Sequence, residues 1–167
     1  MKKRSMDKYQ FAKKLQEQKV KYYRIAYSYV KNEHDALDIV GEATYKALKD
    51  LHTLQQPEYF DTWMTRIVIY TAIDYIRKNA RIVCYEDNLI DVMSVAESDL
   101  AVEDSMDLFD ALDVLSERER AGVVLRYFEE YSFTKIAEIL QEPEPTVKSR
   151  IYRALEKMHR FIEEGRI

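Results

Sequence analysis

The side chains best suited to bind a ligand or another macromolecule lie in a predicted helix over residues 144–161 of this 167-residue chain. Pro145 fits the first turn of such a helix, because proline lacks an N–H that this turn would leave unpaired. One side carries apolar residues at helical spacing and is expected to face a core. The other side gathers hydrogen-bond donors, a ring and positive charge: Lys148, Ser149, Tyr152 and Arg153. These groups suit insertion into a DNA major groove.

A basic helix face also has a simpler interpretation, as the solvated side of a small helical bundle. Arg150 lies near the apolar edge of this helix, where it can serve either the DNA backbone or the fold. The face by itself does not decide between these interpretations, so the rest of the chain must.

The composition indicates an all-α protein. Only three glycines and three prolines occur, no alternating β-branched runs are present, and 47% hydrophobic residues suffice for a core. The single Cys84 excludes an internal disulfide and a cysteine-based zinc site. The basic N-terminus has no apolar segment behind it, and no stretch approaches a membrane span. We therefore expect a soluble, cytoplasmic protein.

The net charge of −4 is unevenly distributed. Residues 1–80 hold 15 basic and 10 acidic side chains, and residues 120–167 hold 9 and 8. Residues 81–119 hold only 2 basic side chains against 12 acidic ones. Because the local field governs binding to a polyanion, the total charge does not exclude nucleic acid. The pattern predicts two helical lobes joined by an acidic linker over about residues 81–104, with apolar residues that could dock on a surface.

The first lobe is expected to begin with a helix capped by Asp7, followed by a second helix that Asp35 can cap. On the second helix Asp35, Asp38 and Glu42 form an acidic ridge at spacings of three and four. Such a ridge is either screened by solvent or used by a basic partner. Gly41 lies in the middle of this helix, where it costs about 1 kcal/mol relative to alanine.

A third helix, entered at Pro57 and running to about residue 78, is apolar nearly all the way round and is predicted to be central in its lobe. Its other residues interleave rings with cations, a combination suited to unstacked bases, although Phe60 and Trp63 can equally be core residues. Asp74 is expected to pair with Arg77 or Lys78. The interleaved residues are Tyr59, Phe60, Trp63, Arg66, Tyr70, Arg77 and Lys78.

The second lobe is predicted to contain four short helices. Ser116 and Glu119 have capping-box spacing, and Ser132 can cap a short helix over residues 133–140. That short helix, a tight connection and the helix over residues 144–161 have the outline of a helix-turn-helix.

The motifs do not favour catalysis. Gly-rich phosphate loops, nucleophile elbows and His-Glu-x-x-His are absent from the sequence. Glu156 and His159 make half of a di-iron pair, but such a site needs that pair twice and two further glutamates. We therefore predict no enzyme, no metal and no cofactor.

Several segments resemble the bacterial extracytoplasmic-function sigma factors. They are DALDIVGEA at 35–43, WMTRI at 63–67 with IDYIRK at 73–78, ALDVL at 111–115 with Arg120, and TVKSRIYRA at 146–154. The match covers both lobes in the right order. The last segment is specific when it follows a short helix at this distance.

The resemblance implies sigma region 2 over residues 1–80, a linker over 81–104 and sigma region 4 over 105–167. It implies a factor that binds the clamp helices and flap of RNA polymerase core and directs the enzyme to promoters by −35 and −10 recognition and DNA melting. It also implies a chain that is monomeric when free and is sequestered by an anti-sigma factor, often membrane-anchored.

The resemblance also assigns residues to the three surfaces. Core binding would use Asp35, Asp38, Ile39 and Glu42. The −10 element would meet Tyr59, Phe60, Trp63, Arg66, Tyr70, Arg77 and Lys78. The −35 element would meet Thr146, Lys148, Ser149, Arg150, Tyr152 and Arg153.

Four positions depart from the family pattern: Gly41 replaces a usual glutamine, Tyr70 an asparagine, Pro145 a glycine and Lys135 an acid. A DNA-binding regulator whose first lobe senses a ligand or dimerises is the alternative interpretation. Transcription that depends on core polymerase distinguishes the two hypotheses.

Overall fold

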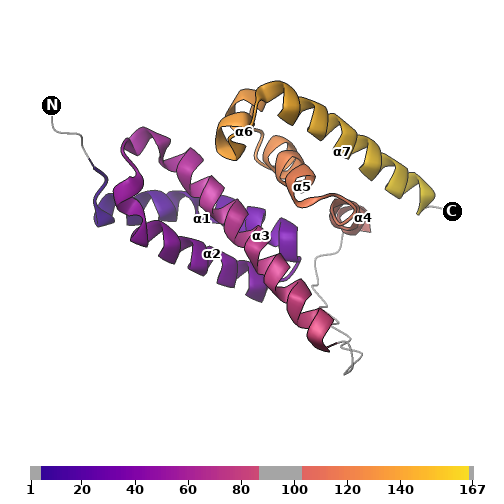
Figure 1. Cartoon of the computed structure of the whole chain (residues 1–167), viewed down its shortest axis with the longest axis horizontal. Helices are drawn as coiled ribbons and strands as arrows, with labels where there is room; N and C mark the ends of the chain where they lie inside the picture. The colour runs from indigo at the N-terminus through magenta and orange to yellow at the C-terminus, as the bar shows by residue number, and fades with distance from the viewer. Residues whose placement is uncertain (1–4, 87–102, 166–167) are drawn as a thin grey trace.

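The computed structural model of the chain describes residues 5–86 and 103–165, and the regular elements within these ranges are all helical, which confirms the all-α prediction. In chain order the elements are α1 (Lys8–Val30), α2 (Glu33–Lys49), the short turns η1 (Leu51–Thr53) and η2 (Pro57–Tyr59), α3 (Phe60–Glu86), α4 (Glu103–Leu112), α5 (Glu117–Val123), the π-helical turn η3 (Val124–Phe128), α6 (Phe133–Leu140) and α7 (Glu144–Glu164). Figure 1 shows α1, α2 and α3 packed as a first lobe, and α4 to α7 as a second lobe.

Local capping signals explain where the helices of the first lobe begin. Asp7 and Gln10 form the expected capping box at α1, with Gln10 N–H donating to Asp7 Oδ1 at 2.8 Å. The prediction that Asp35 caps α2 is wrong. Asn32 is the N-cap, and its side chain accepts from Asp35 N–H at 3.0 Å. Asparagine is an equally good cap, and its earlier position lets α2 begin three residues sooner.

α3 is longer than its sequence pattern predicts. It continues as far as Glu86, so residues 81–86 of the predicted linker are helical. The rest of that linker, including the apolar residues predicted to dock, lies outside the described residues apart from the start of α4. No helix in residues 5–86 or 103–165 combines the length and the apolar character needed to cross a bilayer.

The second lobe contains the predicted caps and one close helix packing. Ser116 and Glu119 form the capping box of α5, and Ser132 caps α6 by accepting from Lys135 N–H at 3.1 Å. A Cβ added at Gly122 on α5 would lie 2.8 Å from Cγ1 of Ile151 on α7. α5 and α7 therefore pack in direct contact only because position 122 has no side chain.

The two lobes pack against each other, and Arg120 joins them. Its buried guanidinium donates to the carbonyl oxygen of Leu112 at 3.1 Å and to that of Tyr29, in α1, at 3.3 Å. It also lies 5.4 Å from the centre of the Tyr29 ring and pairs with Asp113 at 3.1 Å. Since a buried charge is stable only when its donors are satisfied, Arg120 fixes both its own lobe and the contact with α1.

Candidate nucleic-acid and protein interfaces

The outward face of α7 carries the predicted groove-contacting side chains. Val147, Ile151, Ala154 and Met158 are buried on the other side of the helix. Because a helix repeats every 3.6 residues, burial of this stripe turns the intervening positions toward solvent. Of the predicted −35 contacts, the exposed ones are Thr146, Lys148, Ser149, Tyr152 and Arg153.

A half-buried ring at the start of α6 organises this face. The Phe133 ring lies 6.0 Å from the Tyr152 ring, and Nζ of Lys148 lies 5.7 Å from its centre. The guanidinium of Arg126 lies 4.5 Å from the same ring. Both cations therefore lie within cation–π distance of the Phe133 ring. Phe133 was not predicted from the sequence, because only the α6–α7 packing brings it to residues 15 and 19 positions away.

Arg150 belongs to a different environment. Its guanidinium is half-buried and pairs with Glu142 in the turn between α6 and α7. Glu142 also accepts from Arg118 of α5 at 3.1 Å. These pairs hold the turn, and Thr134 bonded to Glu144 at 3.0 Å reinforces it. Of the two roles that the sequence left open for Arg150, the contacts of its side chain favour the fold.

A hollow of about 330 Å³ lies beside the start of α3. Tyr59 is largely exposed at its edge and Trp63 is half-buried in its wall. A hollow lined by rings and polar groups can hold an unstacked base. Its full lining is Thr53, Leu54, Gln55, Gln56, Tyr59, Thr62, Trp63 and Arg66.

Phe60 does not take part in this hollow. Its side chain is only 2% exposed, and its ring packs edge-on against Phe11 of α1 with centres 5.7 Å apart. The prediction that Phe60 contacts DNA is therefore wrong for this conformation, because the core of the first lobe encloses the ring. The alternative core interpretation applies to it.

The cations of α3 differ in their surroundings. Arg66 donates through Nε to the carbonyl oxygen of Ile139 and through Nη2 to that of Glu138, both at 2.7 Å. Arg77 pairs with Glu117 of α5, Nε to Oε1 at 2.9 Å, rather than with an acid of its own helix. Lys78 is exposed. Tyr70, a further predicted DNA contact, is 46% exposed and lines a cavity whose walls come from α3 and from the second lobe.

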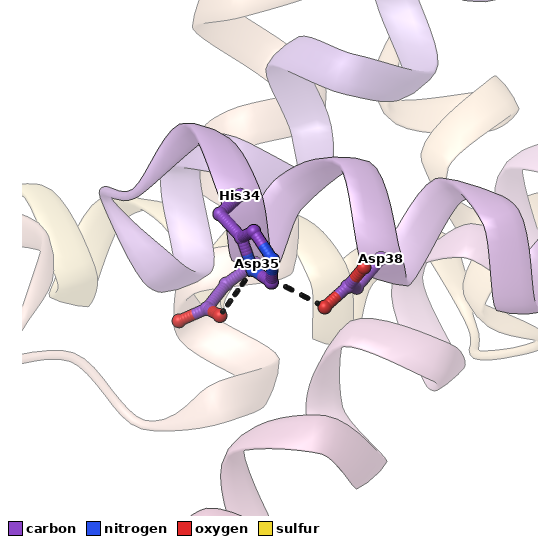
Figure 2. A group of neighbouring side chains, drawn as sticks. All are labelled: His34, Asp35 and Asp38. Carbon is purple, nitrogen blue, oxygen red and sulfur yellow. Dashed lines mark ion pairs between the residues drawn. The ribbon is translucent and has the colours of Figure 1, made fainter.

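The acidic ridge on α2 is accessible but not unpaired. Figure 2 shows His34 between Asp35 and Asp38, with Nδ1 at 3.6 Å from Asp35 Oδ1 and 3.4 Å from Asp38 Oδ2. Asp35 also accepts from the Tyr75 hydroxyl at 2.8 Å, and burial together with this hydrogen bond raises the pKa of Tyr75. These three ligand-type side chains come from little more than one helical turn and lie at the surface, so nothing besides their proximity points to a metal.

Ile39 is a correction to the predicted core-binding set. Its side chain is completely buried among α1, α2 and α3, so it supports the ridge from below. A feature that the sequence reasoning missed lies beside the ridge on the solvent-exposed side of α2. Leu37, Tyr45 and Leu48 are exposed there around Gly41, where an added Cβ would meet nothing within 4 Å. Their helical spacing was the available signal.

Comparison with known proteins matches both lobes to the same protein family. Residues 16–82 match the family model of sigma-70 region 2, and residues 105–158 match that of sigma-70, region 4. The RNA polymerase sigma factor SigV of Bacillus subtilis is 41% identical over 158 residues, which cover 95% of this chain and 94% of the relative. The extracytoplasmic-function sigma factor SigW of the same organism is 28% identical, covering 87% and 85%.

Two solved structures share the fold. The sigma factor RpoE in complex with the anti-sigma factor NepR from Bartonella quintana superposes with a TM-score of 0.74 at 22% identity, covering 92% of this chain and 96% of that one. CnrH in complex with the cytosolic domain of CnrY gives a TM-score of 0.71 at 21% identity, covering 96% and 92%.

Proposed function

Because this chain belongs to the extracytoplasmic-function sigma factors of the sigma-70 family, we propose that its three surfaces divide the work of promoter-directed transcription initiation. A sigma factor binds RNA polymerase core, brings it to promoter DNA and leaves nucleotide chemistry to the polymerase. In this proposal α7 contacts the −35 element, α3 the −10 element and α2 the polymerase.

The hollow beside α3 is the observation that carries the proposal. It combines a volume of about 330 Å³ with a largely exposed Tyr59, a half-buried Trp63 and the guanidinium of Arg66. A flipped base needs both an enclosed aromatic surface and a positive group near its phosphate. Base stacking on an aromatic side chain contributes about 1–3 kcal/mol per base, so one base held here would favour strand opening.

On α7 the proposed −35 contacts are Lys148, Ser149, Tyr152 and Arg153, with Thr146 at the helix start. The N-terminal half of a recognition helix meets base edges, while flanking cations meet phosphates. Arg150 is left out of this set, since its pair with Glu142 positions the helix.

On α2 the proposed polymerase contacts are Asp35, Asp38 and Glu42, without the buried Ile39. Charged surfaces of opposite sign steer two proteins together and fix their register. The ridge would accordingly meet basic residues of the polymerase clamp helices. Core binding holds both DNA-contacting lobes in one assembly, which raises the effective concentration of each for its element.

We also propose that an anti-sigma factor covers these surfaces, because RpoE and CnrH were both solved with a protein partner, NepR and CnrY respectively. The chain would act in the cytoplasm, where its polymerase works, and would need no catalytic activity of its own.

Run-off transcription with purified core polymerase tests the proposal. Transcripts from a cognate promoter are expected only when the chain is added. Tyr59→Ala should reduce open-complex formation by about tenfold, through the loss of one stacked base. Tyr9→Ala removes an exposed tyrosine from α1 of the same lobe and should leave activity unchanged. Duplex binding that does not depend on core polymerase, with no stimulated transcript, would instead favour a classical DNA-binding regulator.

A further inference from the structure

A cluster of rings and cations lies where α6 meets the exposed face of α7. Its centre is Phe133, the first residue of α6, whose side chain is half-buried. Nζ of Lys148 lies 5.7 Å from the centre of this ring, and the Tyr152 ring lies 6.0 Å away, tilted by 54°. The guanidinium of Arg126, in η3, lies 4.5 Å from the same centre. Two of the proposed −35 contacts therefore share one neighbour that is not itself in the proposed set.

The Phe133 ring is held in place by its own helix and by Arg126. Ser132 caps α6 by accepting from Lys135 N–H at 3.1 Å, which fixes the first turn. Arg126 donates through Nη1 to the carbonyl oxygen of Tyr131 at 3.0 Å, so the guanidinium beside the ring is anchored as well. A cation within about 6 Å of a ring centre is attracted by the face of the ring. The ring thus lies on a support that α7 does not supply.

Lys148 differs from Arg150, two residues farther along α7, in the kind of partner it has. Arg150 pairs with the carboxylate of Glu142. Among the ion pairs of the described residues, Lys148 takes part in none, and its ammonium lies beside the Phe133 ring. A carboxylate neutralises a cation and occupies its N–H groups, whereas a ring leaves the charge in place and the N–H groups that point away from it free to donate. Lys148 is therefore ordered without being used up.

Ordering of Lys148 and Tyr152 before DNA arrives should favour recognition. A lysine side chain loses rotamer freedom when a contact orders it, and this loss reduces the affinity of the complex. Rings at the separation of Phe133 and Tyr152 attract each other, so the Tyr152 ring is restricted too. A contact with a base edge depends on the direction of the donor, while a phosphate contact mainly positions the protein. The ordering should therefore matter most for the cognate sequence.

We propose that Phe133 is a positioning residue for −35 recognition, which orients the Lys148 ammonium and the Tyr152 ring toward the base edges. The inference rests on the proposed −35 role of α7. Phe133 acts through these two neighbours, with Arg126 supporting its ring, and makes no base contact of its own. Removal of the ring should weaken initiation at the cognate −35 element more than at other sequences.

The test compares two templates that carry the same pre-opened −10 region and differ only in the −35 element. The full chain with core polymerase is assayed at limiting chain concentration on the cognate element and on a scrambled one. Phe133→Leu keeps an apolar side chain but removes the ring. It should lower the initiation rate on the cognate template by about fivefold, through the lost cation–π and ring–ring contacts. The rate on the scrambled template should be unchanged.

Two further variants separate the ring from the stability of the helix. Phe133→Tyr keeps the ring and should restore most of the cognate rate. Tyr127→Leu removes an exposed ring from η3 of the same lobe and should leave both rates unchanged. Amide hydrogen exchange in α6 and α7 reports whether each variant is folded. An equal loss of rate with Phe133→Tyr and with Phe133→Leu would overturn the inference, because the ring would then not be the group that matters.

A double-mutant cycle tests whether the ring acts through Lys148. Lys148→Met removes the ammonium and keeps an unbranched side chain. In this background Phe133→Leu should lower the cognate rate by only about twofold, because the remaining effect passes through Tyr152. The same fivefold loss in both backgrounds would assign Phe133 a purely structural role or a DNA contact of its own, and the inference would be wrong.

The outcomes keep this inference distinct from the proposed function. If Lys148→Met lowers the cognate rate and Phe133→Leu does not, the −35 role of α7 stands and the inference fails. If the unmodified chain initiates equally on both templates, the −35 role and the inference fail together. A selective loss with Phe133→Leu that Phe133→Tyr restores, and that Lys148→Met diminishes, supports both.

Discussion

The two proposed DNA-contacting helices carry similar side chains in very different surroundings. α7 packs through one apolar stripe, so its opposite face stays in solvent with Lys148 and Arg153 exposed. α3 lies in the middle of its lobe and also touches the second lobe, so Arg66 and Arg77 are already paired. The difference indicates that a helix packed through one apolar stripe leaves its polar face in solvent, whereas a helix packed between two lobes has part of its polar face paired.

The largest effect of a single substitution is expected from replacing a glycine by alanine, and the sign of the effect should differ between the two lobes. Gly122→Ala would place a Cβ 2.8 Å from Ile151, forcing α5 and α7 apart at a cost of about 1–3 kcal/mol. Gly41→Ala meets nothing within 4 Å and removes a helix-destabilising glycine, so it should stabilise the first lobe by about 1 kcal/mol.

Amide hydrogen exchange assigns these changes to their lobes. Gly122→Ala should lower protection in α5 and α7 and leave α2 unchanged, while Gly41→Ala should raise protection in α2. Equal loss of protection in both lobes with Gly122→Ala would mean that the lobes unfold as one unit. The whole chain would then have a single free energy of unfolding.

The next effect concerns the exposed face of α7. Arg153→Ala should reduce initiation by about tenfold at a promoter that depends on its −35 element. The slope of log affinity for duplex DNA against log salt concentration should become shallower by about 1, as expected for the loss of one phosphate contact. Core binding should be unaffected, because the ridge on α2 is distant in sequence and belongs to the other lobe. Loss of core binding would contradict the division of roles.

Arg160→Ala is the matched control. It removes an exposed arginine from the same helix, two turns farther from the N-terminal half that would enter the groove. A decrease as large as that of Arg153→Ala would show that the helix contributes general positive charge rather than placed contacts.

Much of the fold follows from local rules that the sequence displays. Asp7 with Gln10 and Ser116 with Glu119 form capping boxes because each needs only residues three positions apart. The start of α2 was harder to predict, since Asn32 and Asp35 both offer a suitable acceptor. The helical continuation of α3 into residues 81–86 was missed because the apolar periodicity ends before the helix does.

The contacts of the site residues were less predictable, because they depend on partners far along the chain. Arg66 meets carbonyl groups more than 70 residues away, and no local pattern specifies which helix end an arginine will cap. Ile39 lies at the border between the ridge and the apolar side of α2, where only the packing of neighbouring helices decides its burial. Sequence periodicity therefore predicted which side chains share a helix face, but not which of them are buried or already paired.

The smallest effect would sharpen the comparison by changing the support of α7 with pH. Glu119, at the start of α5, accepts a hydrogen bond from the backbone N–H of Ser116 and pairs with Lys157 of α7 at 2.7 Å. Burial raises the pKa of Glu119, but the hydrogen bonds from Lys157 and Ser116 outweigh it, so the net pKa lies below its usual 4.5. A depressed carboxyl pKa contributes stability that is present above the unfolded-state value and is lost as the pH falls through the folded-state value.

Glu119→Gln should accordingly lower the stability of the second lobe by about 0.5–1 kcal/mol near neutral pH, with the difference from the unmodified chain shrinking below about pH 4.5. Denaturant titrations at several pH values, followed by exchange protection in α5 and α7, measure the effect. Glu156→Gln removes an exposed acid from α7 without touching the Ser116 cap and is the control. A constant difference at all pH values would assign the loss to packing rather than to charge. The same loss of protection in α2 would mean that the two lobes lose stability together, because Glu119 makes its contacts within the second lobe.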